Sequence, residues 1–167
     1  MTRPDGSKKP RTTIDLLVLE ASIPVLSAPR RTSSWSTMKP ADLVMQSYGR
    51  CCASDGFFDS FYQYFLASSP QIRDRFANTD MPAQKLLLRH GILNLVMYAR
   101  GMPDTKLRAL GATHARDGFN IRPELYDLWL GALLQAIGEH DKSCDADIRL
   151  AWREVLNKGI DVIKAQY

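Results

Sequence analysis

Cysteine and histidine are both scarce in this chain of 167 residues, with three of each. The three cysteines, Cys51, Cys52 and Cys144, have no spacing typical of a metal site, and two of them are adjacent. Such an odd set does not form the disulfide framework of a small secreted protein. We therefore interpret all three as reduced thiols and expect a cytoplasmic protein.

Long apolar runs are also missing. The apolar stretch at residues 14–26 follows a basic start, as in a signal peptide, but Asp15 and Glu20 interrupt it. It is too short to cross a bilayer, and the two acidic residues argue against an export signal. We expect neither a membrane partner nor export.

The positive charge of the chain is concentrated near its beginning. The formal net charge is +4, and residues 1–37 hold six basic but only three acidic side chains. These residues are rich in Ser, Thr, Pro and Arg and lack periodicity, so we predict a disordered or loosely attached extension at 1–37 before a domain at 38–167. A second interpretation is that Met38 is the true start. Because the rest of the chain is nearly neutral, a nucleic-acid partner is not expected.

No stretch after Met38 shows the alternation of a β-strand, whereas apolar residues recur at helical spacing. Ser54, Ser69-Pro70 and Thr79-Asp80 are typical helix starts. The predicted helices cover about 40–51, 55–66, 70–76, 80–100, 104–118, 123–137 and 145–167. Six or seven helices of unequal length predict an all-α globular fold rather than a regular four-helix bundle.

His114 is the first candidate for chemistry. It follows Leu107 and Leu110 at helical spacing and therefore shares their inward face. A lone histidine on such a face is more often structural than a ligand. However, the Thr113 hydroxyl, or a backbone carbonyl one turn back, can accept a hydrogen bond from one ring nitrogen, as the orientation of a metal ligand requires.

Two segments resemble a known family. Residues 65–76, with Pro70 and Phe76, are similar to the junction between the second and third helices of globins. Residues 107–114 resemble the globin proximal helix, and the gap of 38 residues from Phe76 to His114 fits a version without the small fourth helix. The resemblance covers about residues 40–167. It implies a globin-like fold close to bacterial single-domain globins of the flavohaemoglobin or globin-sensor type.

The resemblance assigns roles around a haem b group. His114 becomes the axial ligand of the iron, and Leu110 lies one turn before it. Phe76 corresponds to the phenylalanine that packs on the haem, and Tyr62 to the position that points over the iron. Arg116 is close enough to pair with a haem propionate, or it is a solvated charge at the helix end.

The register of the long helix on the distal side stays open. Gln84 ranks first, as the glutamine that accompanies a distal tyrosine, with Leu88 as the apolar residue over the iron. Leu87 ranks second, with Gly91 one turn later. His90 ranks third, because its distance from the proximal histidine is too short.

The implied function is reversible binding of O₂, NO or CO at a five-coordinate iron, for oxygen binding, scavenging or sensing. NO dioxygenase activity would need an external reductase, because the chain has no flavin or nicotinamide domain. One alternative is a non-haem globin-fold regulatory protein, with a homodimer face on the helices after Pro123. The other is an unrelated all-α binding module in which His114 is structural.

Overall fold

The computed structural model of the protein describes residues 38–167, and within this range it contains seven α-helices and no β-strand. The predicted extension at residues 1–37 lies outside the described residues. The all-α prediction is confirmed. The helices are α1 (Pro40–Cys52), α2 (Phe57–Ala67), α3 (Pro70–Phe76), α4 (Met81–Ala99), α5 (Thr105–His114), α6 (Leu125–His140) and α7 (Ala146–Lys164).

Three helices begin at side-chain caps, and the sequence predicted two of them, those of α3 and α4. The Ser69 hydroxyl accepts a hydrogen bond from the Gln71 N–H at the start of α3. Carboxylates do the same on the longer helices, where Asp80 accepts from Ala83 N–H in α4 and Asp145 from Ile148 N–H in α7. Each cap satisfies a backbone donor that has no partner inside its own helix, and so defines where the helix starts.

Ser54 does not cap α2, contrary to expectation. The residue before this helix is Gly56, in a left-handed conformation with φ of 83° and no side-chain cap. The Ser54 hydroxyl lies 2.7 Å from His140 Nδ1 instead. The hydroxyl that was predicted to cap α2 thus forms a hydrogen bond with a residue 86 positions away in the chain.

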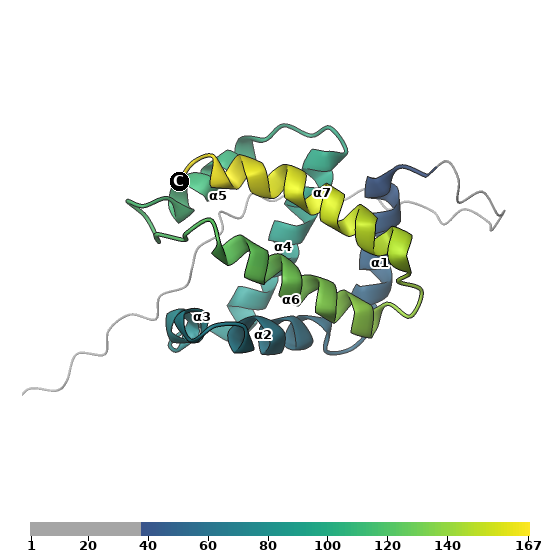
Figure 1. The fold of residues 1–167 in the computed structure, drawn as a ribbon, viewed down its shortest axis with the longest axis horizontal. Coiled ribbons are helices and arrows are strands. Elements are labelled where there is room, and N and C mark those ends of the chain that lie inside the picture. Colours follow the sequence, from purple (N-terminus) through teal and green to yellow (C-terminus); the bar gives the residue numbers. More distant parts are fainter. Residues whose placement is uncertain (1–37) are drawn as a thin grey trace, which may run out of the picture.

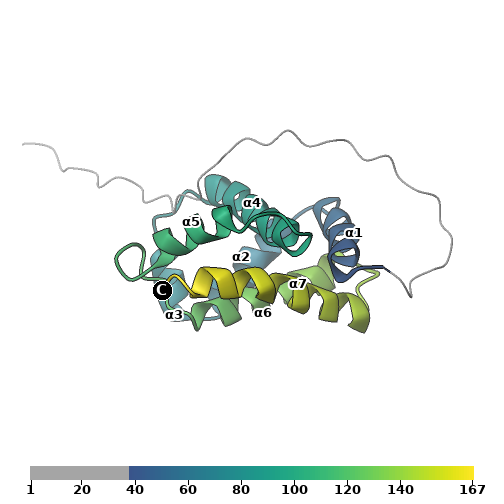
Figure 2. The same cartoon turned by 90° about the horizontal axis from the view of Figure 1, so that it is seen from above.

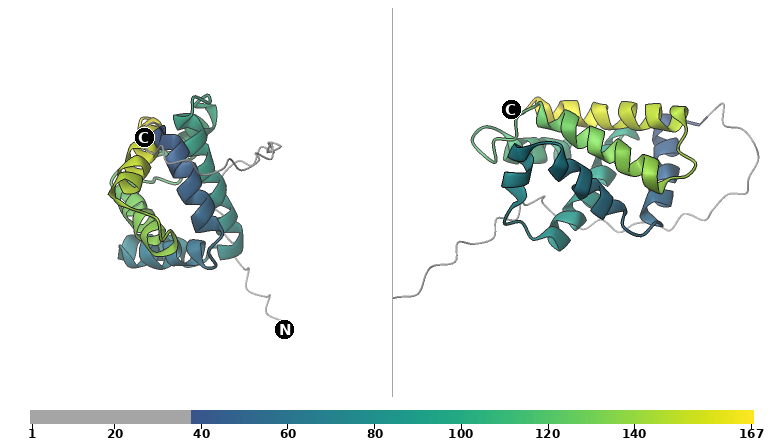
Figure 3. Two further views of the ribbon diagram at one scale, coloured as in Figure 1. Left: turned by 90° about the vertical axis from the view of Figure 1, so that its right-hand side faces the viewer. Right: turned by 60° about the horizontal axis from the view of Figure 1, so that its bottom comes forward.

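The helices cross one another at steep angles around a common core. In Figure 1, α6 and α7 lie side by side in front of α4, and α1 stands at the far end from α5. Figure 2 shows the molecule from above, with α4 and α5 on the opposite side of the molecule from α6 and α7. Helix α2 packs under α6, and α7 contacts α1, α4 and α5 (Figure 3). The small fourth helix is lacking, as expected, because only four residues separate Phe76 from the start of α4 at Met81.

The core is formed where these helices cross. Its largest fully buried side chains include Trp152, Phe57, Phe61, Leu133, Ile137 and Leu156. Among the described residues, no helix is long and apolar enough to cross a membrane.

Candidate functional site

An apolar pocket opens between the helices near the end of α5. Its cavity volume is about 140 Å³. Concave sites lined mainly by apolar side chains, with a few polar groups among them, are typical ligand sites. The lining residues are Phe61, Tyr62, Phe65, Ile72, Arg75, Phe76, Gln84, Leu87, Leu88, Gly91, Leu95, Leu110, His114, Ile121, Leu125, Tyr126, Trp129, Ile160 and Ile163.

His114 is the last residue of α5 and lines this pocket. Its Nδ1 lies 2.8 Å from the Tyr126 hydroxyl on α6, while no hydrogen bond to Nε2 is found within residues 38–167. Burial lowers the pKa of His114 to about 4, because a charged imidazolium loses its hydration in these surroundings. At neutral pH the ring is therefore uncharged, which is the form that binds metals.

Tyr126, rather than Thr113, orients the histidine. The Thr113 hydroxyl donates to the Leu110 carbonyl at 2.7 Å, and no hydrogen bond within residues 38–167 joins it to the ring. Burial raises the pKa of Tyr126, so its hydroxyl keeps its proton. When His114 Nδ1 carries a proton, it donates to the Tyr126 oxygen, and the lone pair of Nε2 is then free for a ligand bond.

On α2 and α4, Tyr62 and Gln84 lie next to each other in the pocket wall. The Tyr62 hydroxyl donates to the backbone carbonyl of Gln84 at 3.2 Å, and burial raises the pKa of this tyrosine. The Gln84 side chain is buried at 9% exposure, and its Oε1 has no hydrogen-bond partner in the described part of the chain. A buried amide oxygen without a partner is costly unless a bound molecule or water satisfies it.

The structure brings two of the three predicted distal registers to the pocket. Gln84, Leu87, Leu88 and Gly91 all line it, so the same face of α4 carries both the first and the second alternative. His90 is exposed and is not part of the lining. The only polar side chain that this face of α4 presents to the pocket is that of Gln84.

The remaining predicted residues divide between the pocket and the surface. Phe76 and Leu110 line the pocket, and the Phe76 ring packs 5.9 Å from that of Tyr62, between centroids. Arg116 lies outside the lining and is exposed, with its guanidinium 4.9 Å from the ring centroid of Tyr167.

Arg75 is the cation at the pocket, and the sequence analysis did not single it out. It lies on α3 directly before Phe76, and it donates to the carbonyls of Phe119 and Asn120 at 2.9 and 3.0 Å. Its neighbour Phe76 was the only local signal. Helix α3 is short and carries three charged residues in a row, Arg73, Asp74 and Arg75. Helix phase alone therefore does not tell which of them faces inward.

The arrangement of an inward histidine opposite Tyr62 and Gln84, in an all-α fold, can be compared with known proteins. The globin family model matches residues 59–163. The chain belongs to the globin family.

A solved relative supports the same assignment. The crystal structure of a protein from Pseudomonas aeruginosa PAO1, described as structurally highly homologous to a human hemoglobin, is 70% identical to this globin. The match covers 77% of this chain and 98% of that one, with a TM-score of 0.76. The predicted resemblance to bacterial single-domain globins is thus confirmed. No curated protein matches the chain.

Proposed function

We propose that this globin binds haem b in the apolar pocket and uses it for reversible binding of O₂, NO or CO. Haem supplies an iron with an open sixth coordination position when the fifth is taken by a histidine. His114, Phe76, Tyr62, Gln84, Leu88 and Leu110 would hold the group, and all six line the same pocket.

The observation that carries this proposal is the state of His114. It presents an uncharged ring to an apolar pocket, with Nδ1 held by Tyr126 and no hydrogen bond to Nε2 among the described residues. A structural histidine in a core normally has both nitrogens satisfied, as His140 does between Ser54 and Ser60. This difference from His140 supports a ligand role for His114.

Gln84 and Tyr62 supply the polar groups of the distal wall. The Gln84 side chain has no partner for its buried oxygen, so its amide is free to turn and donate from its nitrogen toward a ligand. The Tyr62 hydroxyl donates to the Gln84 backbone and can exchange this long bond of 3.2 Å for a better acceptor. Two such donors slow the release of a gas ligand that carries partial negative charge, which suits scavenging or sensing.

The pocket also bears on the alternative of a non-haem globin-fold protein, in which side chains fill the crevice. Here the crevice keeps a cavity of about 140 Å³ beside His114, and no single side chain occupies it. A homodimer and an external reductase remain predictions. Cytoplasmic location likewise remains a prediction.

Titration of the purified protein with hemin tests the proposal. We expect a Soret band of a histidine-bound haem, and a shift of this band on reduction and addition of CO. The variant His114→Ala removes the axial nitrogen and should bind hemin at least roughly tenfold more weakly, with a changed spectrum. His90→Ala is the matched control, because His90 is exposed and outside the pocket.

Two results would overturn the proposal. One is an absence of a Soret band after reconstitution of a folded protein. The other is a spectrum that is the same in wild type and in His114→Ala, since the iron would then be held elsewhere.

A further inference from the structure

Arg75 occupies an unusual position at the wall of the pocket. Its two terminal nitrogens are used within the protein, since Nη1 donates to the Phe119 carbonyl and Nη2 to the Asn120 carbonyl. Its third nitrogen, Nε, is buried and has no hydrogen-bond partner among residues 38–167. An arginine fixed at two nitrogens and unsatisfied at the third presents a donor with a set direction.

Arg75, the residue that carries this unsatisfied donor, lines the pocket. Only two buried side-chain polar atoms of the described chain lack a partner, Arg75 Nε and Gln84 Oε1. Both residues line the same pocket. Buried polar groups without partners are rare in proteins, so two in one pocket point to a ligand that satisfies them.

The two carbonyls that Arg75 holds lie in the α5–α6 loop, which we define as residues 115–124. Asn120 in this loop has a φ of 50°, the only positive value found for a non-glycine residue in the described chain. Asparagine adopts this conformation more readily than most residues with a side chain, and here two neighbours also hold it. Arg75 supplies this support from α3, and Tyr167 adds a hydrogen bond from its hydroxyl to Asn120 Oδ1 at 2.8 Å.

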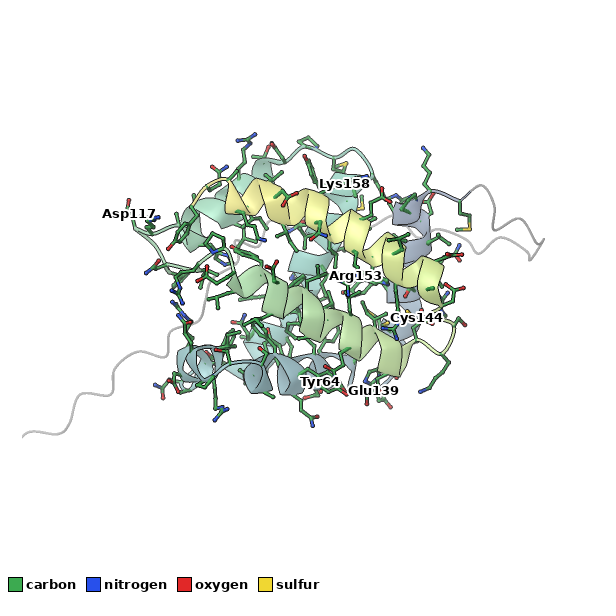
Figure 4. The ribbon with its side chains drawn as sticks, viewed as in Figure 1. Tyr64, Asp117, Glu139, Cys144, Arg153 and Lys158 are labelled. Carbon is green, nitrogen blue, oxygen red and sulfur yellow. The ribbon has the colours of Figure 1, made fainter. Side chains whose placement is uncertain are left out.

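The α5–α6 loop is in turn attached to the proximal histidine. The Ile121 N–H donates to the His114 carbonyl at 2.8 Å, and the Phe119 N–H donates to the Thr113 carbonyl at 2.9 Å. Figure 4 shows Asp117 at the outer tip of this loop, away from the helices, whereas residues 119–122 form the contacts that join the loop to the molecule. A continuous set of hydrogen bonds therefore runs from Arg75 through the loop to the end of α5.

We propose that Arg75 is a positioning residue that couples a carboxylate on the pocket's ligand to the α5–α6 loop, and through the loop to His114. The proposal rests on the proposed function, because it takes the ligand to be a carboxylate-bearing porphyrin. A carboxylate accepts from Nε–H while Nη1 and Nη2 keep the two loop carbonyls, so all three nitrogens are satisfied together. Ligand binding then tightens the loop instead of releasing it.

Arg116, the propionate partner expected from the sequence, makes none of these contacts. Its guanidinium lies over Tyr167 and it is exposed. An exposed cation contributes little to the binding of a carboxylate, since water and salt screen it. A direct comparison of matched Arg75 and Arg116 variants therefore tests which of the two arginines binds the carboxylate.

The first experiment compares hemin with its dimethyl ester, in which both carboxylates are masked. Trp129 lines the pocket, so quenching of tryptophan fluorescence reports binding of either compound. We expect the wild type to prefer the free acid by about tenfold, the ratio typical of a charge-assisted hydrogen bond in a partly buried site. Arg75→Gln should reduce this ratio to about one, whereas Arg116→Gln should keep it.

The second experiment measures hydrogen exchange of the amides of Phe119 and Ile121 in the same samples. In the wild type, hemin should slow this exchange more than the ester does. In Arg75→Gln the two compounds should have the same effect. Arg75→Lys keeps a charge but not the three-nitrogen fork, so it should retain part of the affinity ratio while losing the extra protection of the loop.

The outcomes separate this inference from the proposed function. If neither compound binds to the wild type, haem binding itself is wrong. If both bind but the ratio survives in Arg75→Gln, or disappears in Arg116→Gln, haem binding stands and the role of Arg75 is overturned. A ratio that depends on Arg75 without any change in loop exchange overturns the coupling to the loop.

Discussion

Gln84 is a polar residue at a buried position, and without a ligand its side-chain oxygen has no hydrogen-bond partner among the described residues. Its buried Oε1 has no partner in the described chain, while the rest of its surroundings on α4 are the apolar Leu87 and Leu88. A buried polar atom without a partner costs about 1–3 kcal/mol, and a leucine at the same place avoids this cost. We therefore expect Gln84 to lower the stability of the haem-free protein.

The variant Gln84→Leu should raise the free energy of unfolding of the haem-free protein by about 1 kcal/mol. After reconstitution, O₂ dissociation should be about tenfold faster, because a donor near the gas is lost. Urea denaturation and stopped-flow spectroscopy measure the two effects. Gln46→Leu, at an exposed position of α1, should change neither. Unchanged O₂ dissociation in Gln84→Leu would favour the Leu87 register.

At this scale the sequence predicted residues that share a helix face, but not partners from other helices. His114 and Leu110 both line the pocket, because helical spacing places them on the same face of α5, whereas Phe76 was assigned to the site by the resemblance alone. The contact between Tyr126 and His114 could not be predicted from helical spacing, because Tyr126 lies on α6. Only the packing of α5 and α6 brings its hydroxyl to the His114 ring.

Close approach between helices depends on Gly159 in the middle of α7. A Cβ atom there would clash with Leu95 Cδ2 on α4 and would lie 3.1 Å from Leu107 Cδ1 on α5. Both leucines are buried, and Leu95 also lines the pocket. The three helices therefore pack at a distance that only glycine at this position allows.

Gly159→Ala should lower the free energy of unfolding by about 1–3 kcal/mol, since the extra methyl group forces the leucines or the helices to move. Gly131→Ala is the control, because nothing lies within 4 Å of its Cβ position on α6. That change should be neutral or stabilise by about 0.5–1 kcal/mol through helix propensity. Thermal denaturation of the two variants gives the comparison. Equal effects would show that α4, α5 and α7 have room at this crossing.

Helix boundaries followed the sequence where a cap is local and departed from it elsewhere. Asp80 caps α4 as predicted, and α7 starts next to Asp145, where the beginning of the last helix was predicted. Helix α5 ends at His114 rather than near Gly118, and α6 begins at Leu125. In this region Arg75 and Tyr167 hold the loop from outside, and such tertiary contacts leave no trace in the local pattern.

On the scale of the whole molecule, Asp141 joins segments from both ends of the domain. Its carboxylate accepts from Arg50 Nε at 2.7 Å, from Arg50 Nη2 at 2.8 Å and from the Ser47 hydroxyl at 2.6 Å. Trp152 Nε1 donates to the same hydroxyl at 2.9 Å, which brings α7 into the network. The Asp141 side chain is fully buried, so these bonds connect α1, the turn after α6 and α7 in a place that water does not reach.

Burial raises the pKa of Asp141, but hydrogen bonds from Arg50, Ser47 and the Ser143 N–H lower it by more. The pKa of this carboxyl group therefore lies below its ordinary value of 3.8. A carboxyl group with a lowered pKa stabilises the fold fully above its unfolded-state pKa, and this contribution is lost as the pH falls through the folded-state pKa.

Asp141→Asn should therefore lower the free energy of unfolding by about 1–3 kcal/mol at neutral pH, and by clearly less near pH 2.5. Urea denaturation at several pH values measures the difference. Asp127→Asn, which removes an exposed partner of Lys164, should cost less than about 0.5 kcal/mol at every pH. If the difference in free energy of unfolding between wild type and Asp141→Asn stayed constant down to pH 2.5, the charge of Asp141 would not be what stabilises the contact between α1 and the turn after α6.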